Sequence, residues 1–481
     1  MSSSESLDSR LEGLLERRKR NSTYRSLKGY RTVQTASDRT GSSKDELIDF
    51  SSNDYLSITH SPSLRSRYLR RLENCPASLF GSAGSRLLDG TTPYHTSLEQ
   101  RLARYFSYAS GTTDGDPSTS DTSALLFNSG YDANVSFFST VPQRGDYIVH
   151  DELVHASVWD GMRGNARRGV PESQRYSFRH NSVDALERVL RQIISLEIER
   201  HGKGIIYVAL ESLYSMDGDL APLDEILTLL DSLRREFPHH VNPNKVILVL
   251  DEAHTTGVSG KGGRGLAWHL QDRGQGPDRD ERYRSRARRV RDWCQVRVMT
   301  FGKAVGGQGA VLVASPAVRQ FLINYARPFI FSTAMSVNNV LAIESAWNVL
   351  ESDEGDQRRR DLQRICNIFN HEVSRLLQEN VVPDTLLSLL ADKDAATPTE
   401  PTHITPLITP HPHSLALHLR EQGFLTRPVV HPTVPKGRER VRVCLHAGNR
   451  EEDVLGLLAA IRVWLLHGPH TAAAPPLKAR L

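Results

Sequence analysis

The sequence predicts an α/β protein with a large, mainly parallel sheet and a smaller C-terminal α+β domain. Between about residues 49 and 340, apolar runs of strand length alternate with amphipathic helical stretches. Such runs are typical of parallel strands that helices cover on both faces. After residue 340, two long helical patterns precede three short strand patterns, "THITPLITP", "GFLTRPVV" and "RVRVCLHA". At 481 residues, the chain is also longer than one core usually supports.

We expect four parts along the chain: residues 1–48, 49–340, 341–468 and 469–481. The first is a helix and arm, because residues 8–30 show a basic amphipathic pattern in which Leu11, Leu14 and Leu15 share one face. The second is the large domain, the third the small domain and the last a loose tail. Polar segments near 110–122 and 271–289 are predicted to be surface insertions, the second of them a solvated loop.

Composition excludes several classes of protein. The net charge of +4 is small for this length and does not favour a nucleic-acid partner. No apolar run approaches the roughly 18 residues that a membrane helix needs. The four cysteines form no CxxC pair, so we expect neither a disulfide framework nor a metal site.

The chain ends in Ala479-Arg480-Leu481, which resembles the C-terminal SKL address that a peroxisomal import receptor reads. Acidic residues among the first twenty count against a mitochondrial transit peptide. We therefore expect a peroxisomal protein, and otherwise a cytoplasmic one.

The string "LDEAHTTG" (250–257) contains the Asp-Glu-Ala-His box of one class of helicases. Such an ATPase needs a G-x-x-x-x-G-K-[ST] loop upstream of the box, and the sequence contains none. Asp251 instead ends an apolar strand, at the edge where α/β sheets bind ligands, and His254 follows in the next turn. A simple capping role for Asp251 is the alternative.

A lysine in a glycine-rich turn follows the next strand. Lys303 stands after Thr300 and among glycines, a setting in which an amine can be desolvated for Schiff-base chemistry, although an ordinary surface lysine fits the same pattern. Pyridoxal 5'-phosphate needs such a lysine, a carboxylate at its ring nitrogen and a phosphate cradle at a helix N-terminus. Asp251 and the turn Ser129-Gly130-Tyr131 supply the last two, so the sequence predicts this cofactor. His155 is placed to lie flat on the ring, and Ser215 to bind its hydroxyl.

Eight segments, in order, resemble the α-oxoamine synthases, a branch of the fold type I pyridoxal-phosphate-dependent enzymes. They are "SSNDYL", "SGYDAN", "HDELVHAS", "ESLYSMDGDLAPL", "LDEAHTTG", "TFGKAVGG", "FIFSTAMS" and "PTVPKGRERVRV", and the likeness runs from about residue 10 to 465. The resemblance implies an acyltransferase that condenses an amino acid with an acyl-CoA and releases CoA and, usually, CO₂. It also implies a homodimer with shared active sites.

The resemblance also assigns roles to individual residues. Those implied to be catalytic are Lys303, His155, Asp251 and His254. Those implied to bind the cofactor further include Gly130, Tyr131, Ser215, Thr300 and, at the phosphate in the partner subunit, Thr333. Those implied to bind the substrates are Arg25, Asn53, Thr433 and Arg442.

Within the family, "SMDGDLAPL" with Asp219 most resembles the 8-amino-7-oxononanoate synthases, which join L-alanine to pimeloyl-CoA in biotin synthesis. One departure is Val430, where these enzymes often have an arginine; Arg427 lies nearby. The alternatives are a glycine C-acetyltransferase, a 5-aminolevulinate synthase, a serine palmitoyltransferase, a secondary-metabolism homologue and a non-catalytic partner subunit. Lys303, present with all its neighbours, argues against the last.

Overall fold

The computed structural model describes residues 6–21, 23–33, 46–76, 80–107, 122–164, 169–272, 281–379, 385–390 and 401–468. It divides into two compact units, one of residues 53–362 and the other of residues 1–52 and 363–481. The sequence placed the domain boundaries near residues 49 and 340. In the structure the second boundary falls later, within helix α13 (Asp353–Glu379), and the N-terminal arm belongs with the C-terminal unit.

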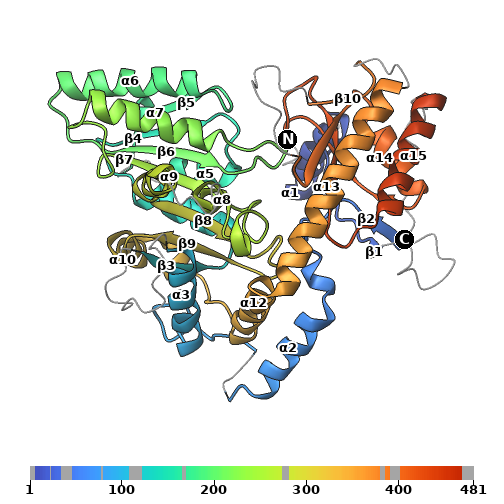
Figure 1. Ribbon diagram of the computed structural model, residues 1–481, viewed down its shortest axis with the longest axis horizontal. Coiled ribbons are helices and arrows are strands. Elements are labelled where there is room, and N and C mark those ends of the chain that lie inside the picture. Colours follow the sequence, from blue (N-terminus) through green and yellow to red (C-terminus); the bar gives the residue numbers. More distant parts are fainter. Residues whose placement is uncertain are drawn as a thin grey trace, which may run out of the picture. The chain divides into compact units, whose positions relative to one another are not determined.

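The larger unit, residues 53–362, contains a seven-stranded sheet in the order β3-β9-β8-β7-β6-β4-β5 (Figure 1). Its strands are β3 (Ser123–Phe127), β4 (Tyr147–Asp151), β5 (Arg175–Phe178), β6 (Ile206–Glu211), β7 (Val246–Asp251), β8 (Val296–Thr300) and β9 (Ala310–Ala314). Neighbouring strands are parallel except on the two sides of β9. The mainly parallel sheet predicted from the apolar runs is therefore confirmed, and β3 still points the same way as β8.

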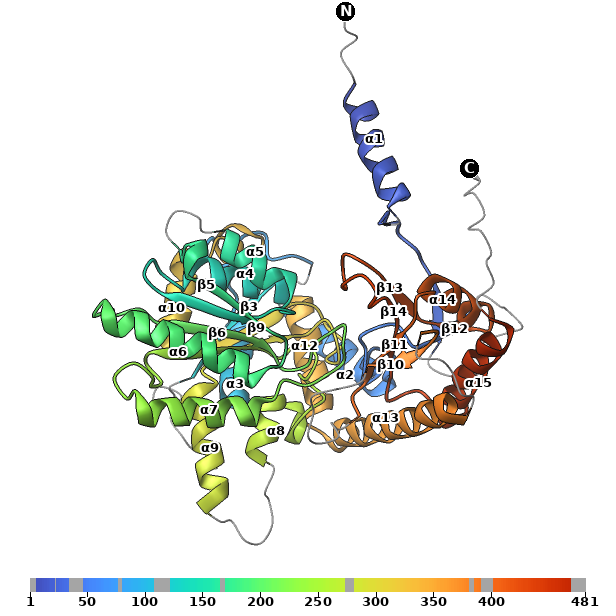
Figure 2. The same ribbon diagram turned by 90° about the horizontal axis from the view of Figure 1, so that it is seen from above.

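Helices cover both faces of this sheet, and Figure 2 shows α6 and α7 on one side with α4 and α5 on the other. The core on the first face is formed with α6 (Val183–Glu199), α7 (Leu223–Glu236), α8 (Leu266–Asp272) and α9 (Glu281–Trp293). The core on the second face is formed with α4 (Gly130–Thr140), α5 (Ala156–Arg163), α10 (Pro316–Tyr325) and α11 (Arg327–Phe331). The unit is completed by α2 (Pro62–Glu73), α3 (Pro93–Phe106) and α12 (Val337–Leu350).

The other unit combines the two ends of the chain. Strands β1 (Arg31–Val33), β2 (Glu46–Asp49) and β12 (Phe424–Leu425) form a parallel sheet in the order β1-β2-β12. Strands β10 (Ser388–Leu389), β11 (Ile404–Ile408), β13 (Arg427–Val429) and β14 (Arg440–Cys444) form an antiparallel sheet in the order β10-β11-β14-β13. The helices are α1 (Leu7–Arg20), α14 (Pro412–Glu421), α15 (Glu451–His467) and the later part of α13. This mixture matches the predicted α+β character.

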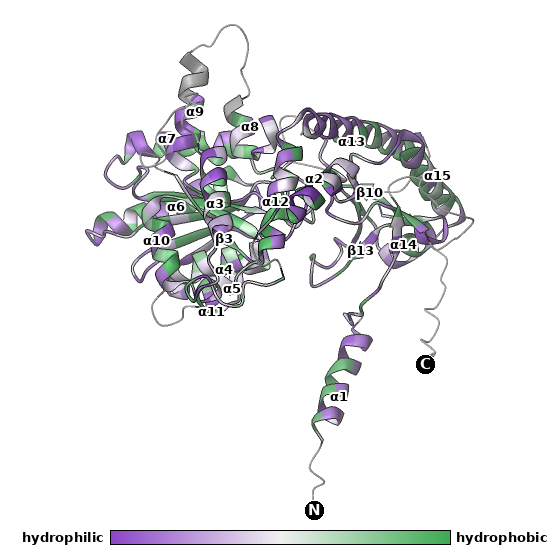
Figure 3. Ribbon diagram, turned by 90° about the horizontal axis from the view of Figure 1, so that it is seen from below, coloured by the Kyte–Doolittle hydropathy of each residue, from purple (hydrophilic) through white to green (hydrophobic). Residues whose placement is uncertain are grey.

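The N-terminal helix is shorter than predicted. Helix α1 ends at Arg20, and its cap Asn21 bonds back to the last turn, whereas the sequence predicted a helix over 8–30. The residues after Asn21 include Ser, Thr and Gly, which favour helix weakly, and the basic pattern alone does not sustain one. The helix has an apolar and a polar side (Figure 3), but none of its residues is buried.

The second insertion was expected to be a loop, and this is wrong for its later part. Residues 281–293 form helix α9, which buries Val290 and Trp293 in the core. Arg286 and Arg289 approach Asp224 on α7 at 3.6 and 3.4 Å. Helix α9 is therefore held by ion pairs to α7 and by two apolar residues near its C-terminus. Its charged sequence shows no apolar periodicity, so the pattern did not predict a helix. The first insertion, apart from Thr122, and the tail with Ala479-Arg480-Leu481 lie outside the described residues.

The described residues include neither a membrane-spanning helix nor a metal-binding cluster. None of the helices described is long and apolar enough to cross a membrane. Nor does that part of the chain bring three or more His, Cys, Asp or Glu side chains together in a way that suits a metal ion.

Candidate active site

The carboxyl ends of five strands bring most of the predicted residues to one edge of the large sheet. Gly130 and Tyr131 follow β3, His155 follows β4 and Ser215 follows β6. Asp251 is the last residue of β7, and Thr300 the last of β8. Because these strands point the same way, their ends meet at one edge, where α/β sheets bind ligands.

Lys303 and His254 are in direct contact at this edge. Lys303 Nζ lies 2.8 Å from His254 Nε2, and His254 is buried while Lys303 is half-buried. The turn that carries Lys303 is closed by a bond from Gly306 N to the Lys303 carbonyl (2.8 Å). Gly309 ends the turn with φ +103°, and a Cβ there would lie 2.8 Å from the Phe127 carbonyl oxygen. Only glycine fits that position, because the backbone of Phe127 lies too close to the turn for a Cβ.

The carboxylate of Asp251 is held by two hydrogen bonds. Asn134 Nδ2 donates to Oδ2 at 2.7 Å, and the Ala253 N–H donates to Oδ1 at 2.9 Å. Asn134 also donates to Ser157 Oγ (3.0 Å), which lies 2.7 Å from His155 Nδ1. A chain of polar contacts therefore links the orientation of Asp251 to that of His155. Ala253, for which no role was predicted, supplies one of these bonds from its backbone.

His155 caps helix α5, because its Nδ1 accepts from the Ser157 N–H at 3.2 Å. Part of the His155 ring is exposed, but the surrounding atoms desolvate it enough to lower the pKa of His155. The negative charge of Asp251 raises this pKa and the positive charge of Lys303 lowers it, and the net shift is downward. The ring is therefore neutral near pH 7, and its exposed surface is available to a flat ligand. The edge of Tyr131 approaches it, with ring centroids 6.3 Å apart.

A second carboxyl group lies next to Asp251. Glu211 ends β6, pairs in register with Asp251 and accepts a hydrogen bond from the His155 N–H. Burial raises the pKa of Glu211 well above its usual range, and the negative charge of Asp251 adds to this. A protonated Glu211 would add no negative charge beside Asp251.

The residues of the predicted phosphate cradle lie at the start of α4. Ser129 caps this helix by accepting from the Asp132 N–H (3.0 Å), and the N–H groups of Gly130 and Tyr131 belong to its first turn. A Cβ on Gly130 would lie 3.5 Å from Thr300 Cβ, so a bare Cα faces the threonine. First-turn N–H groups have no partner within the helix, and the helix dipole favours an anion there.

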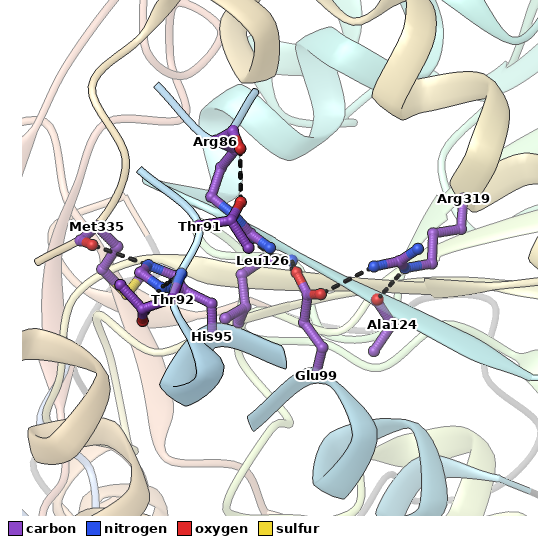
Figure 4. Close-up of polar contacts among 9 residues, drawn as sticks. All are labelled: Arg86, Thr91, Thr92, His95, Glu99, Ala124, Leu126, Arg319 and Met335. Carbon is purple, nitrogen blue, oxygen red and sulfur yellow. Dashed lines mark hydrogen bonds and ion pairs between the residues drawn. The ribbon is translucent and has the colours of Figure 1, made fainter. Parts of the chain in front are cut away.

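A buried ion network supports the strand that leads into this cradle (Figure 4). Glu99 accepts from Arg86, Arg319 and the Leu126 N–H at 2.9, 2.9 and 3.0 Å. Arg319 also donates to the Ala124 carbonyl at 2.9 Å. Three donors on one carboxylate thus hold β3 and α10 against α3, which fixes the position at which α4 begins.

Thr333 lies near the same cradle in its own chain. Its carbonyl accepts from Asn128 Nδ2 (2.9 Å), two residues before Gly130, and it forms an isolated bridge with Ser85. A cavity of about 20 Å³, the size of one water molecule, is lined by residues that include Arg86, Asp132 and Thr333. The side chain of Thr333 is exposed in the single chain. Its contact with the phosphate of a partner subunit stays a prediction.

Ser215 lies in a turn that Asp219 holds in place. His180 contacts Asp151 Oδ1 at 2.9 Å and Asp219 Oδ2 at 2.8 Å, and the edge of its ring packs against Tyr214. Burial lowers the pKa of His180, but hydrogen bonds to Asp151 and Asp219 outweigh it and raise the pKa to about 10. Asp219, the residue that pointed to one branch of the family, therefore has a structural role within this chain.

Of the predicted substrate residues, Asn53 is connected to the site, since its Oδ1 accepts from Tyr55 Oη at 2.9 Å. Arg25, Thr433 and Arg442 belong to the other unit. Arg25 and Thr433 are exposed there, and Arg442 lies in β14 opposite Arg427 of β13. Their roles toward the site in the larger unit stay predictions.

Glu252, also without a role in the sequence, is fully buried and structural. It accepts from Thr255 Oγ1 (2.8 Å) and from the Leu266 N–H at the start of α8, and lies 3.8 Å from Arg297. Burial raises the pKa of Glu252, and Arg297 opposes the rise. Glu252 of the Asp-Glu-Ala-His box thus anchors the fold beside the site.

The residues present fit pyridoxal phosphate. One sheet edge brings together four groups that this cofactor needs. They are a lysine amine, a carboxylate held by two donors, an exposed neutral imidazole and a helix N-terminus whose first residue has no Cβ. The site residues that sequence reasoning missed are Tyr55, Asn134, Ser157 and Glu211. All four lie inside the quoted segments, which was the signal that could have found them.

Comparisons with known proteins agree with this arrangement. The aminotransferase class I and II family model matches residues 45–461. An 8-amino-7-oxononanoate synthase of Emericella nidulans is 40% identical over 87% of this chain and 89% of its own length. An aminoacyl transferase, sphA, of Byssochlamys spectabilis is 32% identical over 86% of this chain and 80% of its own length.

Among solved structures, a serine palmitoyltransferase from S. paucimobilis with a bound PLP–myriocin aldimine superposes with a TM-score of 0.69 and 22% identity. The match covers 95% of this chain and 98% of the other, and it shows that the fold is shared. The chain therefore belongs to the α-oxoamine synthases, a branch of the pyridoxal-phosphate-dependent enzymes of aminotransferase class I and II.

Proposed function

We propose that the protein condenses L-alanine with pimeloyl-CoA and releases 8-amino-7-oxononanoate, CoA and CO₂. The observation that carries the reaction type is the contact between Lys303 and His254 beside Asp251, at the carboxyl edge of the sheet. The choice of substrates is supported by the 40% identity to the Emericella nidulans enzyme over most of both chains.

The roles of the chain's own groups follow from their positions. Pyridoxal phosphate, when bound, supplies an electron-poor ring that stabilises negative charge at the α-carbon of the amino acid. Lys303 would hold the cofactor and, as a free amine, would take the proton from that carbon. Asp251 would face the ring nitrogen, His155 would pack on the ring, and the N–H groups of Gly130 and Tyr131 would bind the phosphate.

Arg427 is the arginine that this chain offers to the free carboxylate of a pimeloyl chain, while the family resemblance assigns Arg442 to the carboxylate of the amino acid. Arg427 and Arg442 are directly opposite in register on the antiparallel strands β13 and β14, so their side chains lie on one face. Arg427 also donates to Ser51 Oγ at 3.2 Å. A guanidinium group favours an anion, and a free carboxylate distinguishes pimeloyl-CoA from acetyl- and palmitoyl-CoA. In this proposal Arg427 takes the role of the arginine that is common at the position of Val430.

The test is the rate of CoA release from a panel of substrates: alanine, glycine and serine, each with pimeloyl-, acetyl-, succinyl- and palmitoyl-CoA. We expect alanine with pimeloyl-CoA to be fastest. In Arg427→Ala, the KM for pimeloyl-CoA should rise about tenfold, as loss of ~1.4 kcal/mol implies. Heptanoyl-CoA, of equal length but without the carboxylate, is the matched control and should be unaffected. Faster release with serine and palmitoyl-CoA, or with glycine and either short acyl-CoA, would reject the proposed substrates.

A homodimer is also part of the proposal. Leu88 and Phe331 are 74% and 69% exposed and flank the bridge between Ser85 and Thr333. Exposed apolar side chains that lie close together favour a protein interface. A second copy of the chain bound at this surface would lie close to Thr333. The mass of the holoenzyme in solution, measured by sedimentation, should be twice that of the chain; a monomer with full activity would reject a shared site.

A further inference from the structure

A chain of three hydrogen bonds runs from Lys303 through His254 and Tyr55 to Asn53. Lys303 Nζ lies 2.8 Å from His254 Nε2, and His254 Nδ1 lies 2.7 Å from Tyr55 Oη. Tyr55 Oη in turn donates to Asn53 Oδ1 at 2.9 Å. Tyr55 is fully buried and His254 nearly so, which makes these bonds stronger than they would be in water.

The chemistry of the end groups fixes the direction of the whole chain. An amide oxygen only accepts, so Tyr55 gives its single proton to Asn53. The Tyr55 oxygen must then accept from His254, so that the imidazole carries its proton on Nδ1. Nε2 is left with a lone pair that faces the amine of Lys303.

The backbone around Tyr55 is held rigidly enough for this task. Asp54 accepts from the N–H groups of Ile58 and Thr59 at 3.0 and 3.1 Å. Arg358 donates to the carbonyl of Leu56 at 2.9 Å. A Cβ on Gly306, in the turn after Lys303, would lie 3.0 Å from Ile58, so this segment packs directly on that turn.

We propose that Tyr55 is a positioning residue that keeps the proton of His254 on Nδ1, so that Nε2 accepts a proton from Lys303. In this step the N–H bond of the Lys303 ammonium breaks, an Nε2–H bond forms, and the positive charge moves to the imidazole. Lys303 is left as a neutral amine that can attack a carbonyl carbon. The inference rests on the proposed function, in which Lys303 holds the cofactor.

The test follows the rate at which the full-length chain, stripped of cofactor, binds pyridoxal phosphate, measured by visible absorbance over a range of pH. In Tyr55→Phe the imidazolium loses the acceptor of its Nδ1 proton and His254 becomes a weaker base. We expect the pH midpoint of the binding rate to rise by about one unit, the shift that loss of one hydrogen bond to a charged group implies. Asn53→Asp keeps and strengthens the acceptor, so its midpoint should stay or fall.

Tyr147→Phe is the matched control, because it removes another buried tyrosine hydroxyl, bonded to Glu197 at 2.8 Å. It should leave the midpoint unchanged. A wild-type midpoint in Tyr55→Phe, or an equal upward shift in both Tyr55→Phe and Asn53→Asp, would overturn the proposal. If instead Lys303→Ala gains the same visible absorbance as the wild type, the proposed function fails, and the two failures are distinguished.

Discussion

At the scale of single residues, the carboxylate of Asp251 is positioned by the side chain of Asn134 and the backbone of Ala253. Asn134 is 2% exposed and divides its amide protons between Asp251 and Ser157. Ser157 is fully buried and fixes His155 from the other side. One asparagine on α4 therefore sets the geometry of both predicted ring contacts.

We expect Asn134→Ala to weaken cofactor binding, because it removes the donor to Asp251 Oδ2 and releases Ser157. The loss of a hydrogen bond to a charged group costs about 1.5–3 kcal/mol, or roughly a 10- to 100-fold rise in the dissociation constant of pyridoxal phosphate. Titration by absorbance measures it. Asn324→Ala, which removes an exposed amide on α10, is the control. Equal affinities in both variants would show that Asn134 has no part in holding Asp251.

The hydrogen-bond partners of these residues could not be predicted from spacing, although the residues lie inside the segments that resemble the family. Lys303 and Asp251 were identified because their residue type and their place after an apolar strand are informative together. Asn134, Ser157 and Tyr55 are common polar or aromatic residues, and each has a partner in the site that lies 23 or more positions away in the chain. Only the fold brings these partners together, so spacing carries no signal of them.

At the scale of elements, His180 connects the turn after β4 with the turn after β6. His180 follows β5 and joins Asp151, at the end of β4, to Asp219, in the turn after β6. Asn181 adds bonds of 2.8 Å to the same two carboxylates, one from its N–H and one from its side chain. Through this clamp, the turn that carries His155 and the turn that carries Ser215 are held at a fixed separation.

The clamp predicts a pH dependence of stability. The pKa of His180 is about 10 in the folded protein and 6.5 by default, so folding favours the protonated form. Its stabilising effect is complete below about pH 6.5, declines above it by up to ~1.4 kcal/mol per pH unit and is absent above about pH 10.

Thermal unfolding of the wild type and of His180→Gln measures this effect. The gap between their melting temperatures should be largest at pH 6.5 and should close toward pH 10. A gap that is constant over this range would mean that His180 is not charged in the fold.

Elements with an apolar pattern were predicted well, and charged ones were not. The strands β6 and β7 are continuous apolar runs, and the structure buries nearly all of their residues. Helix α9 has few apolar residues, and it is held instead by Arg286 and Arg289 against α7. The helix predicted over 8–30 failed in the opposite way, because a basic pattern continued past the cap at Asn21.

At the scale of the whole molecule, the order of segments along the chain was sufficient to predict the large sheet and the family. The family model and the relatives cover most of the chain, in agreement with the eight quoted segments. The domain boundaries were harder, because α13 runs without interruption through the boundary after Leu362. A helical pattern has no feature that marks where one compact unit ends within it.

The central claim is that Lys303 is the residue that binds the cofactor. Reduction of the holoenzyme with borohydride makes the bond between lysine and cofactor permanent, and mass spectrometry of the digested protein then locates it. We expect the pyridoxyl group on Lys303 and none in Lys303→Ala. A pyridoxyl group on another lysine of the wild type, or full CoA release by Lys303→Ala, would contradict the claim.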